Sequence, residues 1–114
     1  MVGRRPSKPG HVVARLDHGV RVTVEWTEPD VGGTDVAGYV IKYNDRVRVT
    51  EAEISVGRVT TFQFTNQLTE WMSYRFAVAA VNSAGQLGKF SEFTDYIRTE
   101  CHLPKFHAKK KTLQ

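Results

Sequence analysis

The chain has 114 residues and a formal net charge of +4, and 40% of its residues are apolar and 25% charged. This length suits one ordinary domain, and the composition is that of a globular protein and not of a disordered one. The single cysteine, Cys101, excludes a disulfide-based scaffold. A membrane-spanning helix is excluded as well, because no apolar run reaches the roughly 18 to 20 residues that it needs.

The net positive charge of the chain comes from its two ends. Residues 1–8 include three basic residues and residues 101–114 include four, with no acidic residue in either segment. The intervening segment 9–100 has nine basic and twelve acidic residues, which gives it a net charge of −3. We therefore expect a basic N-terminal linker over 1–8, one domain over 9–100, and a basic, disordered C-terminal tail over 101–114.

Apolar residues in segment 9–100 alternate with polar ones, and this period of two residues indicates β-strands. No window of eleven residues has a helical stripe. The expected strands lie at 12–16, 20–26, 39–43, 47–56, 60–65, 74–80 and 90–99, and turn residues separate most of them. Seven short strands at close spacing predict an all-β fold, a seven-stranded antiparallel immunoglobulin-like β-sandwich.

Three large residues indicate which type of sandwich to expect. Trp26 ends the second expected strand, and Tyr74 opens the sixth, six residues after Leu68. A tyrosine in this place typically forms a hydrogen bond with backbone a few residues upstream, an arrangement called the tyrosine corner. No cysteine lies in the second or the sixth strand, so the inter-sheet disulfide of immunoglobulin domains is excluded.

Two longer strings complete the pattern. The first is Gly32-Gly33-Thr34-Asp35-Val36-Ala37-Gly38-Tyr39, and the second runs from Glu70 to Gly85 as Glu-x-x-x-Tyr-x-Phe-x-Val-x-Ala-x-Asn-x-Ala-Gly. With these strings the chain resembles a fibronectin type III domain, most of all those of titin- and twitchin-type muscle proteins or of neural adhesion receptors. The alternation of apolar residues and this resemblance together predict the residues of the core and the tyrosine corner. They are Trp26, Tyr39, Ile41, Leu68, Tyr74, Phe76 and Val78.

The sequence departs from the family pattern at the corner before the sixth strand. Trp71 stands where glycine is common, and Glu70 stands where proline is frequent. An exposed indole at this place would suit a partner contact, because tryptophan is favoured at interface hot spots. The alternative is that the indole folds over the open end of the sandwich and covers the core. Trp71 and Met72 are therefore candidate contact residues.

Residues with chemical potential do not combine into a recognisable reactive site. Cys101, His102 and His107 offer three metal ligands, but all come from the tail, whereas a structural zinc site needs four ligands that the fold holds in place. Asp17 and His18 suggest a catalytic pair, yet no nucleophile can be assigned to them, and a turn is the preferred interpretation. We predict no catalytic residue, no metal site and no cofactor.

The sequence thus predicts a non-enzymatic structural and protein-interaction module of a larger multidomain protein. Its expected partners are the neighbouring domains of the same chain and an unidentified protein, and the module itself is expected to be monomeric. We favour a cytoplasmic muscle or cytoskeletal protein, because the two strings resemble those of muscle proteins and because none of Asn44, Asn66 and Asn82 lies in a glycosylation sequon. One alternative is an extracellular adhesion or receptor module at the cell surface. A second is binding of an anionic partner, a nucleic acid or a membrane, through the basic ends.

Overall fold

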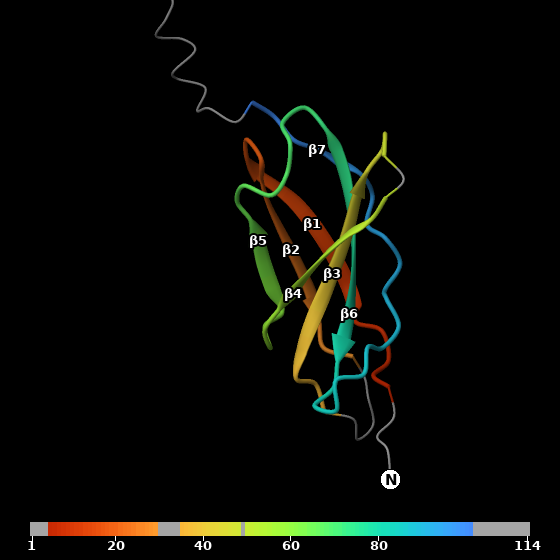
Figure 1. Ribbon diagram of the computed structural model, residues 1–114. Coiled ribbons are helices and arrows are strands. Elements are labelled where there is room, and N and C mark those ends of the chain that lie inside the picture. The colour runs from red at the N-terminus through yellow and green to blue at the C-terminus, as the bar shows by residue number, and fades with distance from the viewer. Residues whose placement is uncertain (1–4, 30–34, 49, 102–114) are drawn as a thin grey trace, which may run out of the picture.

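The computed structural model describes residues 5–29, 35–48 and 50–101, whose strands form two antiparallel sheets that face each other (Figure 1). The three-stranded sheet has the order β1-β2-β5, with β1 at Gly10–His18, β2 at Arg21–Thr27 and β5 at Thr61–Phe64. The four-stranded sheet has the order β4-β3-β6-β7, with β4 at Ala52–Val56, β3 at Gly38–Asp45, β6 at Ser73–Val81 and β7 at Ile97–Arg98. The predicted seven-stranded antiparallel sandwich is confirmed.

The hydrophobic core lies between the two sheets. Across β3 and β6, Tyr39 pairs with Ala80 and Ile41 pairs with Val78, and all four side chains are buried. The rings of Trp26 and Tyr39 meet edge to face with their centres 5.3 Å apart, which joins β2 to β3 across the sandwich. This register buries the apolar half of each alternating strand.

The last predicted strand, 90–99, is only partly correct, because within the described chain just Ile97–Arg98 is a strand there. Before it, residues 87–96 run along β6 as a segment that we call the strap. Ser91 N–H donates to the carbonyl of Val78 at 2.8 Å, and Val78 N–H donates to Ser91 Oγ at 3.0 Å. Thr94 and Phe76 make the same pair of bonds, at 2.8 and 3.1 Å. Hydroxyl groups thus replace backbone carbonyls, and the pairing repeats after three residues instead of two.

The predicted strand 47–56 is shorter than expected and covers only Ala52–Val56. The reason is the side chain of Asp45 at the end of β3. Its Oδ1 accepts hydrogen bonds from the N–H groups of Val47 at 2.9 Å and Arg48 at 2.6 Å. Asp45 therefore binds the backbone that a longer strand would have used, and it turns the chain away from β3.

The N-terminal segment 5–9 packs against the strap. Arg5 Nη1 donates to the carbonyl of Leu87 at 2.9 Å, and Lys8 Nζ lies 3.3 Å from Glu92 Oε2. Between these contacts the backbones come very close, since a Cβ added to Gly88 would lie 2.2 Å from the carbonyl oxygen of Pro6. Only glycine fits at such an approach.

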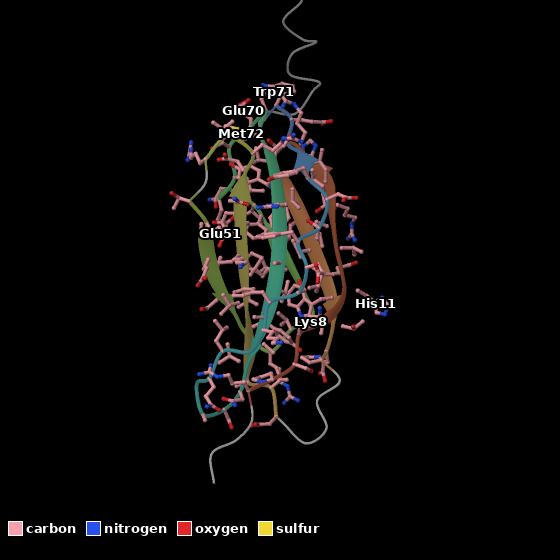
Figure 2. All side chains as sticks on the ribbon, turned by 90° about the vertical axis from the view of Figure 1, so that its right-hand side faces the viewer. Lys8, His11, Glu51, Glu70, Trp71 and Met72 are labelled. Carbon is pink, nitrogen blue, oxygen red and sulfur yellow. The ribbon has the colours of Figure 1, made fainter. Side chains whose placement is uncertain are left out.

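The two ends of the described chain lie at opposite ends of the sandwich. The first described residues are at the bottom of Figure 1, and the last ones leave at the top, beyond β7. Figure 2 shows the same separation, with Lys8 in the lower part of the sandwich and Trp71 at the upper end. The long axis of the domain therefore runs from one chain end to the other.

Candidate interaction surfaces

The corner that leads into β6 is fixed at both of its ends. Thr69 N–H donates to the hydroxyl oxygen of Tyr74 at 2.8 Å, which is the geometry of a tyrosine corner. Thr99, which is fully buried, holds the other end: Met72 N–H donates to Thr99 Oγ1 at 3.0 Å, and Thr99 N–H donates to the Met72 carbonyl at 2.9 Å. Thr99 Oγ1 also donates to the carbonyl of Thr69 at 2.6 Å. Residues 69–72 are thereby held rigidly against β6 and β7.

Trp71 lies in the middle of this corner and points away from the core. Its side chain is 53% exposed, and Figure 2 places it at the extreme end of the sandwich. Its φ angle of 60° is in the left-handed region, where a residue with a side chain is less stable than glycine by roughly 1–2 kcal/mol. Trp71 is neither in the hydrophobic core cluster nor among the residues packed against it.

The other residues expected to matter take different places. Met72 is half-buried and packs against the edge of the core. The remaining residues of the expected set are buried in the core: Trp26, Tyr39, Ile41, Leu68, Tyr74, Phe76 and Val78. The structure thus separates Trp71, which is available at the surface, from all the others.

A row of cations and aromatic rings covers the outer face of the four-stranded sheet, and the sequence reasoning missed it. The ring-centre distances are 4.3 Å from Lys42 to Phe90, 5.3 Å from Lys42 to Phe93, 4.0 Å from Arg75 to Phe93, 5.3 Å from Arg75 to Tyr96 and 4.8 Å from Arg46 to Tyr96. Cations over ring faces at these distances attract the rings. The row fixes the strap to β3 and β6, and its signal is the spacing of three residues between aromatic positions 90, 93 and 96.

The outer face of the three-stranded sheet is polar and centres on Asp17. Its Oδ2 accepts hydrogen bonds from Thr23 Oγ1 and from Gln63 Nε2, and its Oδ1 accepts one from Arg15 Nε at 3.2 Å. Burial acts to raise the pKa of Asp17, but these hydrogen bonds and the charge of Arg15 outweigh it and hold the pKa below its ordinary value. Asp17 and His18 are the last two residues of β1, so the turn begins at Gly19, two residues later than expected.

The comparison with known protein families decides what kind of domain carries these surfaces. The family model described as "Fibronectin type III domain" matches residues 7–95. The chain belongs to the fibronectin type III family. The resemblance seen in the sequence strings is therefore confirmed.

Relatives of this fibronectin type III domain come from two settings. Neural cell adhesion molecule L1 of Takifugu rubripes is 31% identical over 103 residues, which are 88% of this chain and 8% of that protein. The structure of domains A168–A170 from titin has a TM-score of 0.75 and 28% identity, and the match covers 84% of this chain and 32% of that one. The twitchin kinase region from C. elegans has the same TM-score at 21% identity over 85% of this chain and 17% of that one, a likeness of fold. The chain spans only a small part of each relative.

The described residues were also compared with the metal site considered in the sequence. No group of three or more histidine, cysteine, aspartate or glutamate side chains gathers there in a way that could hold a metal ion. Of the three ligands considered in the sequence, His102 and His107 lie outside the described residues. An open hollow of about 250 Å³ beside the corner is lined by polar groups that include Asp45, Glu51 and Gln67. Nor does any helix of this part of the chain have the length and hydropathy to span a membrane.

Proposed function

We propose that this fibronectin type III domain is a non-enzymatic structural and protein-interaction module of a larger multidomain protein. The observation that carries the proposal is the position of the chain ends, which lie at opposite ends of the sandwich (Figure 1). A domain with this geometry joins its neighbours in a line and keeps them a fixed distance apart. Its mechanism is mechanical, because the packed core holds that distance.

The contacts of the end segments support this function. The segment 5–9 is bound to the strap through Arg5 and Lys8, and the strap is bound to β6 through Ser91 and Thr94. A pull on the chain ends therefore acts on hydrogen bonds and packed backbone and not on loose loops. The polar clusters around Asp17 and Asp45 are likewise occupied by bonds that hold strands and turns.

Within this class we propose a muscle or cytoskeletal protein of the cytoplasm. The similarity to the titin domains, with a TM-score of 0.75 and 28% identity over 84% of this chain, supports the choice. Both sequence strings and the lack of a glycosylation sequon agree with it. We expect neighbouring domains of the same chain as its first partners.

The second candidate is an adhesion or receptor module at the cell surface. The observation in its favour is the 31% identity to neural cell adhesion molecule L1 over 88% of this chain. Both candidates share the same fold and the same arrangement of chain ends. They differ in the compartment that the domain occupies.

An antibody against the domain distinguishes the two candidates. It is applied to muscle and neural tissue of the source organism, first to intact cells and then after permeabilisation. Our proposal predicts that a regular filament-associated pattern is seen only after permeabilisation. Labelling of intact cell surfaces would contradict it and support the adhesion candidate.

A further inference from the structure

The surface around Trp71 combines three features. The indole is about half exposed, its backbone has a positive φ angle, and the corner is held rigidly by Thr99 and Tyr74. A large aromatic side chain that is half exposed and held on a strained, rigid backbone is typical of a binding anchor. The second tryptophan, Trp26, is by contrast buried, as core packing requires.

The path of the chain determines what reaches this surface first. Thr99 is hydrogen-bonded to both Thr69 and Met72, the residues on either side of the corner, and Glu100 N–H donates to the Gly19 carbonyl at 2.8 Å. Cys101 is only two residues beyond Thr99. The chain therefore leaves the sandwich beside Trp71, and residues 102–114 follow directly.

We propose that Trp71, with Glu70 and Glu100 at its rim, is the docking surface for the chain's own segment 102–114. That segment contains the apolar residues Leu103 and Phe106, which suit contact with an indole face. At no more than about 3.6 Å per residue, Leu103 lies within roughly 14 Å of Thr99, so the tether keeps it close to the corner. A short tether gives an effective concentration in the millimolar range, and even a small contact area is then occupied.

Charge supports the same occupant. The segment has Lys105, Lys109, Lys110 and Lys111 and no acidic residue, whereas Glu70 and Glu100 are acidic. Basic residues also lie near the corner, namely Arg98 in β7 and Arg46, whose N–H donates to the Ser73 carbonyl at 3.1 Å. Lysine side chains also interact favourably with an indole face. A second copy of this corner would bring Glu70 and Glu100 against their own counterparts, which like-charge repulsion disfavours.

The contact would fix the direction in which the chain leaves the domain. This consequence rests on the proposed spacer function, because a spacer sets the angle between its neighbours as well as their distance. The contact itself does not depend on that function. It is a property of this chain and can be measured on the isolated chain.

The test is tryptophan fluorescence of the full chain and of a variant that ends at Cys101. Trp71→Phe forms of both provide the signal of Trp26, which is subtracted. We expect the shortened variant to shift the Trp71 emission to longer wavelength and to raise its quenching by acrylamide. Leu103→Ser with Phe106→Ser in the full chain should produce the same change, whereas the matched control Leu113→Ser should not.

Two further measurements complete the test. Raising the salt concentration from 0.1 M to 1 M should weaken the protection of Trp71, because the screening length falls from about 10 Å to about 3 Å. Equal unfolding midpoints of all variants would show that the sandwich is unchanged. Identical emission and quenching with and without residues 102–114 would overturn the proposal. Protection that instead rises with protein concentration would overturn it in favour of a second copy as the occupant.

Discussion

At the scale of single residues, hydrogen bonds from a few buried side chains determine how the strands are joined. The hydroxyl group of Tyr74 accepts the Thr69 N–H at 2.8 Å, and that of Thr99 bridges residues 69 and 72. Each hydroxyl group forms hydrogen bonds with backbone groups of the corner that are not paired with a neighbouring strand. Removing one of them leaves a backbone group unsatisfied, which destabilises a fold more than the mean strength of a hydrogen bond suggests.

Replacement of Tyr74 by phenylalanine measures this effect directly. The Tyr74→Phe variant keeps the ring in the core but leaves the Thr69 N–H without its acceptor. We expect the free energy of unfolding in urea to fall by about 1–3 kcal/mol. Tyr96→Phe is the matched control, because the Tyr96 side chain is at the surface, and it should change stability little. An unchanged unfolding midpoint for Tyr74→Phe would show that the corner bond does not stabilise the fold.

The lowered pKa of Asp17 implies that the stability of the domain depends on pH. Its pKa in the folded state is below the unfolded value, so its contribution is fully present above the unfolded pKa of about 4 and is lost as the pH falls through the folded pKa. Asp17→Asn should therefore lower the free energy of unfolding at pH 7, and the difference from the unchanged protein should shrink as the pH falls below about 4. Urea unfolding at pH 7 and at pH 3 measures both. A difference of equal size at the two pH values would contradict this assignment.

At the scale of elements, the strap shows how a strand can be replaced by side-chain hydroxyls. Phe76 is fully buried, and its N–H donates to Thr94 Oγ1. The isosteric change Thr94→Val removes this acceptor, and we expect a loss of about 1–3 kcal/mol in unfolding free energy. Thr65→Val, at an exposed position after β5, is the control and should be close to neutral. Equal effects of the two changes would show that the strap is not held by this hydroxyl.

The contact between the N-terminal segment and the strap can be tested with two glycines. A Cβ at Gly88 would lie 2.2 Å from the Pro6 carbonyl oxygen, whereas a Cβ at Gly57 would have no atom within 4 Å. Gly88→Ala should therefore destabilise the domain by about 1–3 kcal/mol, because the backbones must move apart. Gly57→Ala should leave the thermal unfolding midpoint nearly unchanged. Similar midpoints for both variants would mean that segment 5–9 does not contribute to stability.

These elements also show what can be predicted from the sequence. Strands β2, β3 and β6 were predictable because an inward side chain alternates with an outward one along each of them. The strap was not, since its pairing depends on hydroxyls at positions 91 and 94 that act as acceptors, and its repeat of three has no counterpart in a strand pattern. The late start of β4 was missed for a similar reason, because the Asp45 side chain binds the N–H groups of Val47 and Arg48.

The position of the Trp71 side chain could not be predicted from the sequence either. The local sequence is compatible with an indole over the core or with one at the surface, because Leu68 and Tyr74 occupy the corner in both cases. The choice depends on the backbone, whose φ of 60° directs the side chain outward. Sequence patterns report which residues are apolar, but here they do not report this angle.

At the scale of the whole molecule, the two ends of the described chain lie at opposite ends of the sandwich, and both are bound to its body. Segment 5–9 is bound to the strap, and Thr99 is bound to the corner that leads into β6. A force applied along the chain is therefore transmitted to the two packed sheets together. A spacer function requires this behaviour, whichever protein contains the domain.

The most direct measurement of this central claim is single-molecule stretching of the full chain, held at its N-terminus and through the thiol of Cys101. We predict that the domain keeps its folded length until it unfolds in one step. The length gained in that step should be close to 3.6 Å for each residue between the two handles, less the folded length. Gradual lengthening at low force, or separate early release of segment 5–9 or of the strap, would contradict the account.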